Sequence, residues 1–212
     1  MPEKTVQKEP GKKPAPSKKP KPQQEVVVQI SLSELHPFPD HPFQVREDAS
    51  MQETAESVKE YGVLIPALAR PREDGGYELI AGHRRKHACE LAGLATMPVI
   101  VRDIDRDAAT IIMVDSNLQR ENILPSERAK AYKMKMEAIK RQGARTDLTS
   151  PKISAKFRSD DEVGQDAGVS GDTIRNYIAL TQLVPELQQM VDEKKIALSP
   201  AYQIAALTPK EQ

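Results

Sequence analysis

The sequence predicts a small α+β domain followed by an all-helical domain, with a disordered basic tail in front of both. First, short β-branched segments alternate with helical ones between residues 25 and 118, which is typical of a mixed α/β domain. Second, strand signals vanish after Asn117, and only helical spacing remains. Third, the first 24 residues hold six prolines and seven lysines but few large apolar groups, too few to offset the entropy of ordering. We therefore expect domains at 25–118 and 119–212 behind a tail at 1–24.

Each element of the first domain follows from a local pattern of residues. A β-branched run begins at Val26 and favours a strand. Gly62 and Gly93 follow helical segments and predict where these segments end. A stretch punctuated by prolines at 36–42 is expected to be a loop. The expected strands are 26–30, 65–70, 77–80 and 97–101, and the expected helices are 51–61, 84–92 and 107–119.

The second domain is expected to be helical throughout, and we place its boundary near 118–125. Tyr132, Met136 and Ile139 recur at helical spacing and therefore share one face of a helix. The residues after that helix are polar and interrupted by a proline, which predicts a loop. The expected elements are a helix from 125 to about 143, a loop at 144–155, and two or three short helices at about 160–207.

Composition limits the classes of protein to which the chain can belong. No apolar run approaches the ~20 residues that span a bilayer, so we expect no membrane segment. The start of the chain lacks the apolar core of a signal peptide, and the single cysteine, Cys89, has no partner for an internal disulfide. These features predict a cytoplasmic protein. The formal net charge of zero hides two basic segments, 1–24 with seven Lys against two Glu and 117–145 with eight Lys or Arg against three Glu.

The segment from Gly82 to Arg85 has the features of an anion-binding turn. A predicted strand ends at Gly82, and a helix begins with Arg84 and Arg85. A helix N-terminus offers free backbone N–H groups and a partial positive charge, and forked guanidinium groups suit phosphate oxygens. The glycine also permits close approach of the backbone. The segment lacks the pattern of a P-loop. It predicts a phosphate cradle of another type, or else a surface helix whose arginines are solvated.

Three motifs of this chain occur in the order and spacing of one known family. They are Tyr-Gly-Val-Leu-Ile-Pro at 61–66, Ala-Gly-His-Arg-Arg-Lys-His-Ala at 81–88 and Asn-Leu-Gln-Arg-Glu at 117–121. They resemble the Gly-x-x-x-Pro segment, the Gly-Glu-Arg-Arg-x-x-Ala box and the Glu-Asn-Leu-Gln-Arg-Glu box of the ParB family. The resemblance covers about residues 26–208. It implies an α+β domain of ParB/sulfiredoxin-like fold joined to a helix-turn-helix domain.

The resemblance also implies a function. ParB proteins act in the partition of plasmids, chromosomes or mobile elements. They are nucleoid-associated homodimers that work with a ParA-type ATPase and not with a membrane. They bind a specific, palindromic site in double-stranded DNA, and CTP with Mg²⁺ closes them into a sliding clamp. By resemblance, Gly82, Arg84 and Arg85 would hold phosphates, and Asn117 would help to hold the metal. The implied nucleotide site comprises Gly82, His83, Arg84, Arg85, Ser116, Asn117, Arg120 and Glu121.

Two positions depart from the family pattern. His83 stands where the first box has Glu, and Ser116 stands where the second box has Glu before its Asn. A serine hydroxyl is a weaker magnesium ligand than a carboxylate, because magnesium favours hard anionic oxygens. Asp115 could substitute only if the backbone shifts, since neighbouring helix residues point about 100° apart. We therefore expect nucleotide binding to survive better than hydrolysis, which leaves at most a weak CTPase.

Residues 159–183 have the spacing of a helix-turn-helix. Gly168 would make the turn, and Ser170 would cap the second helix. The outward side of that helix would offer Ser170, Asp172, Thr173, Arg175 and Asn176 to DNA, where Arg suits guanine and Asn suits adenine. The hairpin itself is not basic, so phosphate affinity is expected from Arg128, Lys130, Lys133, Lys135, Lys140, Arg141 and Arg145. The alternative is an ordinary helical hairpin with a solvated charged face.

Other functional classes remain open at this point. A transcriptional regulator with a vestigial nucleotide site would bind its operator but not CTP. A ParB-like nuclease would need a cluster of carboxylates for two metal ions, and none is apparent in the sequence. A sulfiredoxin relative would need a cysteine directly before its His-Arg pair, where this chain has Gly82. Cys89 lies further along the same helix and is expected to be a small buried residue.

Overall fold

The computed structural model describes residues 25–120, 122–147 and 159–212. The tail expected at 1–24 and most of the loop expected at 144–155 lie outside this range. The strands are β1 (Val27–Ser31), β2 (Leu35–Pro37), β3 (Ala67–Pro71), β4 (Tyr77–Ala81) and β5 (Thr96–Val101). The helices are α1 (Ala49–Tyr61), α2 (His83–Leu91), α3 (Arg106–Leu118), α4 (Pro125–Asp147), α5 (Ser159–Ala167), α6 (Gly171–Ala179), α7 (Pro185–Asp192) and α8 (Leu198–Ile204). Two 3₁₀ turns, Leu32–Glu34 and Leu180–Gln182, complete the order.

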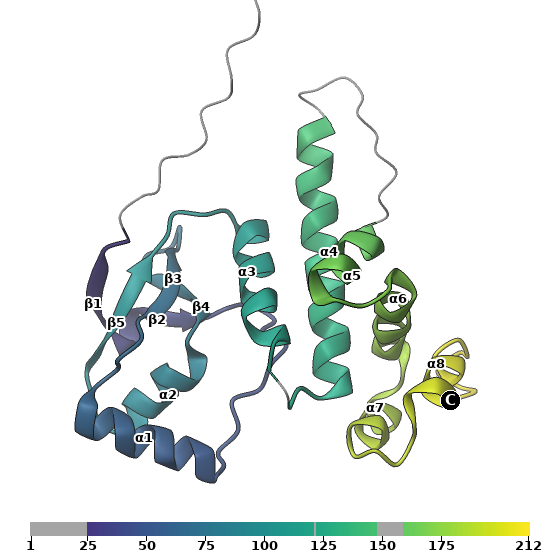
Figure 1. The fold of residues 1–212 in the computed structure, drawn as a ribbon, viewed down its shortest axis with the longest axis horizontal. Helices are drawn as coiled ribbons and strands as arrows, with labels where there is room; N and C mark the ends of the chain where they lie inside the picture. The colour runs from purple at the N-terminus through teal and green to yellow at the C-terminus, as the bar shows by residue number, and fades with distance from the viewer. Residues whose placement is uncertain (1–24, 121, 148–158) are drawn as a thin grey trace, which may run out of the picture.

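The N-terminal part is built on one mixed five-stranded sheet with the order β1-β5-β3-β4-β2. β1 pairs with β5, and β3 with β4, in antiparallel fashion, whereas β3–β5 and β2–β4 are parallel. The parallel pairs require crossovers, and helices α1 and α2 lie between the strands concerned. Figure 1 shows this sheet and α1–α3 on one side of the long helix α4, with α5–α8 on the other side. The α+β and all-helical parts expected from the sequence are therefore confirmed.

Two apolar cores hold the sheet. The first contains Met51 and Val58 of α1 and Ala88 and Cys89 of α2, packed on residues of all five strands. The second joins β4 to α3 and α4. Its buried members are Phe38, Phe43, Ile80, Ala109, Met113, Val114 and Ala131. Because α4 contributes to this second core, the N-terminal domain does not pack independently of the helix that opens the next part.

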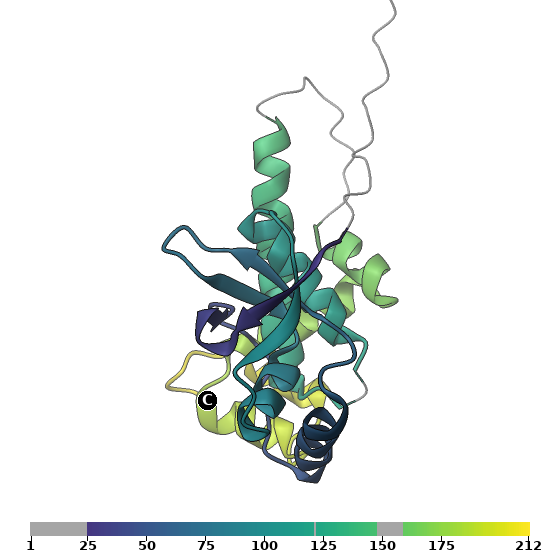
Figure 2. The ribbon, with the colours of Figure 1, turned by 90° about the vertical axis from the view of Figure 1, so that its left-hand side faces the viewer.

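Helix α4 is also the spine of the C-terminal part. Its Tyr132 packs with Val163 of α5 and Ile174 of α6 in one core. Its Ala129 packs with α7, α8 and the 3₁₀ turn at Leu180–Gln182 in another. In Figure 2 the N-terminal sheet stands in front of α4 and the C-terminal helices. Within the described residues, no helix is both long and apolar enough to cross a membrane.

Three sequence-based expectations about the elements were wrong. His36 and Pro37 were expected to lie in a loop but belong to β2, because an edge strand tolerates proline when its free side faces away from the ladder. Helix α4 continues through Gly143, since one glycine costs a helix interior only about 1 kcal/mol. Four helices, not two or three, follow in the described part of the C-terminal region.

Lys135 of α4 joins three helices at one point. Its side chain is 1% exposed, and its Nζ donates to Asp115 of α3 at 2.7 Å and to Asp166 of α5 at 2.9 Å. Burial acts to lower the pKa of Lys135, but its hydrogen bonds to the two carboxylates outweigh this effect and raise that pKa, so the ammonium stays charged. Lys135 was expected among the cations that attract DNA phosphates, and this expectation is wrong because the group is buried and already neutralised.

We expect Lys135→Ala to lower the free energy of unfolding by about 2–4 kcal/mol, because it leaves a cavity and removes the partner of two carboxylates. Urea unfolding followed by circular dichroism measures this loss. The control is Glu137→Ala on the exposed side of the same helix, because its ion pair with Arg141 spans 4.0 Å and contributes about 0.5 kcal/mol or less. Equal effects of the two substitutions would contradict a structural role for the buried ammonium.

Candidate functional site

The turn at Gly82 positions the candidate site. Strand β4 ends at Ala81, and Gly82 adopts the left-handed conformation with φ of 114° as the N-cap of α2. A Cβ at this position would lie 2.8 Å from the Cβ of Ala67 on β3, which is closer than real contacts allow. Glycine is thus required by both the backbone angle and the packing on β3. The sequence suggested that Gly82 lets the backbone approach a ligand. In the structure it lets the backbone of the turn approach Ala67.

The two predicted nucleotide motifs line one pocket, although they are more than 30 residues apart in the sequence. The first lies at the N-terminus of α2, and the second lies at the C-terminal end of α3. The pocket is lined by His41, Phe43, Gln44, Val45, Ala81, Gly82, His83, Arg84, Arg85, Ser116, Asn117 and Arg120. A second hollow shares Phe43, Gln44, Arg84 and Arg120 with the first, so the two are continuous. Glu121, the remaining predicted member of the site, lies outside the described residues.

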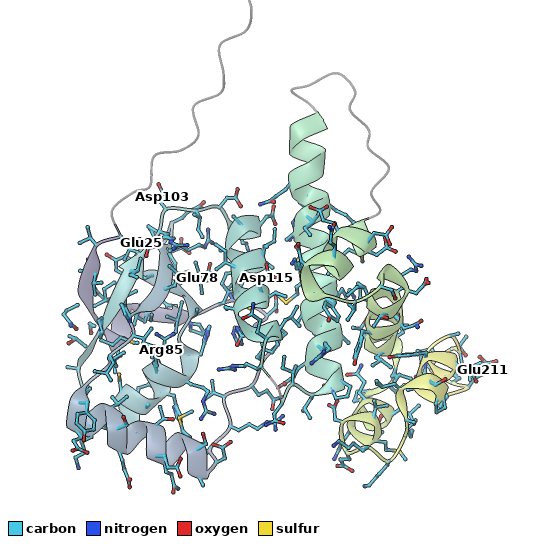
Figure 3. The ribbon with its side chains drawn as sticks, viewed as in Figure 1. Glu25, Glu78, Arg85, Asp103, Asp115 and Glu211 are labelled. Atoms are coloured by element: carbon cyan, nitrogen blue, oxygen red, sulfur yellow. The ribbon has the colours of Figure 1, made fainter. Side chains whose placement is uncertain are left out.

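Three arginines make this pocket electropositive. Arg84 donates to Ser50 Oγ at 3.2 Å and lies 3.8 Å from Asp48, the N-cap residue of α1. Arg85 is held by the backbone, because one of its guanidinium nitrogens donates to the carbonyls of Ile65 and Pro66 at 2.5 and 2.6 Å. Arg85 can be seen on α2 in Figure 3. Burial, and then the charge of Arg120, lower the pKa of Arg85. An anion bound here would relieve this crowding of positive charge.

His83 was predicted to belong to the site, but its neighbour in the pocket, His41, was not. The rings of His41 and His83 lie with their centroids 3.9 Å apart and their planes at 45°. The Nε2 atoms of both are buried and have no hydrogen-bond partner among the described residues. Burial is the main reason that both pKa values fall, and His41, Lys86 and Arg120 add to it at His83, whose pKa drops to about 3. Both imidazoles are therefore neutral at pH 7.

The oxygen ligands that magnesium prefers are few in this pocket. Asn117 is buried, and its amide nitrogen donates to the carbonyl of Met113 at 2.8 Å, which leaves its amide oxygen available. Ser116 Oγ also donates to the carbonyl of Met113, at 2.9 Å. Asp115 does not face this site, because its carboxylate is bound by Lys135 on the α4 side of α3 (Figure 3). With no carboxylate among the described lining residues, most oxygen ligands for Mg²⁺ would have to come from a bound triphosphate.

The predicted helix-turn-helix consists of α5 and α6. Gly168 makes the turn with φ of 69°, and Ser170 caps α6 by accepting from the backbone N–H of Thr173 at 3.2 Å. Gly164 is required, because a Cβ there would lie 2.6 Å from the carbonyl oxygen of Val169. Four of the predicted contact residues, Ser170, Asp172, Arg175 and Asn176, are exposed, and Thr173 is half-buried. The α5–α6 pair therefore presents a polar face.

The cations of this region are less free than the sequence suggested. Arg175 forms ion pairs with Asp160 of α5 and Asp172 of α6. Hydrogen bonding to Asp160 is the main cause that raises the pKa of Arg175. Arg128 lies over the ring of Tyr177 at 5.7 Å, and Arg141 contacts Asp107 at 2.7 Å. Lys130 and Lys140 are exposed, and Lys133 is half-buried. The side chain of Arg145 lies outside the described part.

Comparison with known families decides the classification. The sequence model of the ParB N-terminal domain matches residues 16–118, and that of the ParB HTH domain matches residues 151–212. Together these two models cover more than half of the 212 residues. The chain belongs to the ParB family. Its relatives include the chromosome-partitioning protein Spo0J of Thermus thermophilus, 34% identical over 88% of this chain, and the probable chromosome 1-partitioning protein ParB of Deinococcus radiodurans, 39% identical over 80%.

These ParB relatives are longer than the present chain. The alignments cover 62% of the Thermus protein and 52% of the Deinococcus protein. Among solved structures, the C-terminally truncated ParB of Caulobacter crescentus complexed to the centromeric parS site is 27% identical, with a TM-score of 0.55 over 87% of this chain and 88% of that one. A Pnob8-like ParB-N domain has a TM-score of 0.57 over 85% of this chain and 79% of that one at 19% identity, which supports the fold alone.

The enzyme alternatives receive no support from the geometry of this ParB chain. Cys89 is fully buried in the first core, and burial raises the pKa of its thiol, which disfavours the reactive thiolate. Within the described residues, no group of three or more His, Cys, Asp or Glu side chains is placed to hold a metal ion. Both findings concern the described part of the chain.

The lowered pKa of His83 predicts a loss of stability in acid. The unfolded chain takes up a proton on this side chain below pH 6.5, whereas the folded chain does not until the pH approaches 3. The free energy of unfolding should therefore fall by up to about 1.4 kcal/mol per pH unit as the pH drops below 6.5, or roughly 2 kcal/mol by pH 5. Urea unfolding at pH 7.5 and pH 5 measures this slope. His83→Gln should flatten it, and His87→Gln, outside the pocket on the same helix, serves as the control. A slope unchanged in His83→Gln would contradict this origin.

Proposed function

We propose that this chain is the DNA-binding and nucleotide-binding part of a ParB-type partition protein, in which a nucleotide controls how the protein holds DNA. The observation that carries the proposal is the single pocket formed by both nucleotide motifs of the family, with three arginines and a helix N-terminus directed to one place. The relatives named above are chromosome-partitioning proteins, which favours a chromosome as the replicon over a plasmid or mobile element.

The ligand that fits this pocket best is a nucleoside triphosphate, which we propose is CTP. Arg84, Arg85 and Arg120 offer charge-assisted hydrogen bonds to phosphate oxygens, and the first backbone N–H groups of α2 add a fixed partial charge. The adjoining hollow, continuous with the first through Phe43 and Gln44, leaves room for a sugar and base. The choice of cytosine rests on family membership. Mg²⁺ would enter with the triphosphate, with the free amide oxygen of Asn117 as a ligand from the protein.

We propose that this ParB chain binds a palindromic site in double-stranded DNA as a homodimer and works with a ParA-type ATPase. The parS complex of the Caulobacter relative supports the choice of DNA as the partner. In this chain Asn176 and Arg175 lie exposed on α6, where a recognition helix presents its side chains to base edges. The exposed Lys130 and Lys140 of α4 would add contacts to phosphates.

Contacts between the pocket and α4 suggest how a nucleotide could act on DNA binding. The backbone N–H of Gln44, which lines the pocket, donates to Glu127 Oε1 of α4 at 3.1 Å. Asn117 of the pocket lies on α3, which is tied to α4 through Asp115 and Lys135. A ligand that moves the end of α3 or the loop at Gln44 would therefore pull on α4, on which the helix-turn-helix packs. This arrangement supports a clamp whose closure responds to the nucleotide.

We expect the full chain to bind CTP in preference to ATP, GTP and UTP, and Arg84→Ala to weaken that binding at least tenfold because a charged contact to phosphate is lost. Equilibrium dialysis with labelled nucleotides and MgCl₂ measures both. Lys86→Ala is the matched control, since this cation lies on the same helix but is paired with Glu90 at 3.3 Å and does not line the pocket. Specific DNA binding without binding of any nucleotide would instead favour a transcriptional regulator with a vestigial site.

Hydrolysis has a separate test, because the pocket at Gly82 presents no carboxylate among its described lining residues, and the two carboxylates of the adjoining hollow already have partners. Asp48 lies beside Arg84, and Glu127 accepts from the backbone N–H of Gln44. We expect bound CTP to persist without turnover by the purified protein. A sensitive phosphate-release assay with parS-type DNA present and absent measures this directly. Metal-dependent release of phosphate by the unchanged chain would show that another group replaces the missing glutamates.

On the DNA side, we expect Asn176→Ala to reduce the affinity for the specific site about 5- to 150-fold, because one good base contact contributes about 1–3 kcal/mol. Binding to unrelated DNA, which depends on phosphate contacts, should change little. Fluorescence anisotropy at several salt concentrations separates the two effects. Lys59→Ala on α1, a charge change remote from the hairpin, is the control. Equal losses on specific and unrelated DNA would argue against a base contact by Asn176.

A further inference from the structure

The two unpartnered imidazoles in the pocket are not explained by phosphate binding alone. We propose that His41 and His83 form a site for a divalent transition-metal ion, such as Zn²⁺, Co²⁺ or Mn²⁺, which binds together with the nucleotide and completes its coordination on phosphate oxygens. The proposal deepens the proposed function and rests on it. It changes one part of that function: the ion bound with the triphosphate would be a transition metal held by the two imidazoles in place of Mg²⁺.

The hydrogen bond of His41 fixes which of its nitrogens can bind a metal. Its Nδ1 lies 2.7 Å from the carbonyl oxygen of Phe43. A carbonyl oxygen only accepts, so Nδ1 carries the proton, and Nε2 of the neutral ring has a free lone pair. That Nε2 is buried and unpartnered among the described residues. Metal-binding histidines commonly have this arrangement, with the second ring nitrogen donating to a backbone carbonyl.

His83 provides a second nitrogen beside the first. It is the first residue of α2, so the conformation of Gly82 determines its place in the pocket. Its Nε2 is buried and unpartnered in the same way. Buried polar atoms are nearly always satisfied, and two orphaned nitrogens on adjoining rings indicate a shared ligand.

The charges around the pair explain why the ion would arrive with a nucleotide. Arg84, Arg85 and Arg120 line the same pocket. These cations repel a bare metal ion. A triphosphate neutralises them and supplies oxygen ligands at the same time. Within the described residues the protein alone offers no set of three or more strong ligands, which agrees with a site completed by phosphate.

Ligand chemistry decides the class of metal. Magnesium requires hard oxygen ligands, whereas imidazole nitrogen suits Zn²⁺, Co²⁺, Ni²⁺ and Mn²⁺ to differing degrees. The protein would contribute nitrogen from His41 and His83, and its oxygen donors at the pocket are neutral groups such as Asn117 and Ser116. Since a zinc–nitrogen bond is about 2 Å long, two rings that share an ion stand somewhat further apart than 3.9 Å. His41 lies in a loop, and a shift of its side chain by about 1 Å would separate the two rings enough for both to bind one ion.

The test compares the affinity for CTP with different cations. Equilibrium dialysis of the full chain with labelled CTP is run in Mg²⁺, Mn²⁺, Co²⁺ and Zn²⁺ at pH 7.5, and visible absorption of Co²⁺ reports nitrogen ligation directly. We expect CTP to bind at least tenfold more tightly with Co²⁺ or Zn²⁺ than with Mg²⁺. His41→Gln and His83→Gln should abolish this preference and the nitrogen-type cobalt spectrum, whereas His87→Gln, on the same helix but outside the pocket, should keep both.

A second variant guards against loss of folding. His83→Glu restores a carboxylate, and it should still bind CTP but with the preference moved toward Mg²⁺. Equal affinity for CTP in Mg²⁺ and Co²⁺, or a preference that survives both His→Gln substitutions, would overturn the metal site while leaving nucleotide binding intact. Failure to bind CTP with any cation would overturn the proposed function itself and the metal site with it.

Discussion

The buried ammonium group of Lys135 is the constraint on which the arrangement of this chain depends. A charge removed from water is tolerated only beside its counter-ions, so Asp115 and Asp166 must both stay within hydrogen-bond distance. These carboxylates belong to α3 and α5, two helices that both pack on α4. The ion pairs therefore fix the spacing of a nucleotide-pocket helix, the central helix and the first helix of the DNA-binding hairpin.

The same ion pairs resist separation of α3 from α4. If α3 moved away, the ammonium of Lys135 would keep Asp166 but lose Asp115, so a buried charge would lose one of its two partners. A second pair, Arg141 with the buried Asp107, joins the other end of the same two helices. The pocket lies at the end of α3, so a ligand bound there would contact one of the two helices that these pairs join.

Much of the fold was predictable because it depends on local patterns. The left-handed Gly168 and the close-packed Gly164 specify the hairpin, and both are apparent from spacing alone. The edge strand β2 was missed because its prolines resemble a loop, and only pairing with β4 makes it a strand. The burial of Lys135 was missed for a similar reason. A lysine in a basic run is expected to be solvated, and only the tertiary structure shows that Asp115 and Asp166 from two other helices bind Lys135.

The candidate site was predictable in part. The glycine-arginine turn and the Asn117 motif were both identified, and their meeting in one pocket follows from the family resemblance. The neighbour of His83 was not identified, because His41 precedes it by 42 residues and lies in a proline-rich loop with no periodic pattern. Contacts between a loop and a helix terminus depend on tertiary packing. Sequence spacing carries no information about them.

The acids around Arg175 have a consequence for how the recognition helix would distinguish one DNA from another. The guanidinium of Arg175 already forms ion pairs with Asp160 and Asp172. A DNA group that binds this guanidinium would have to displace these carboxylates, whose negative charges would then lie unpaired beside the negatively charged duplex. A single phosphate oxygen is a poor competitor, whereas the paired acceptors of a guanine edge match both arms of the fork. On the proposed function, the two carboxylates would therefore weaken the contact of Arg175 with DNA phosphates more than its contact with a guanine edge.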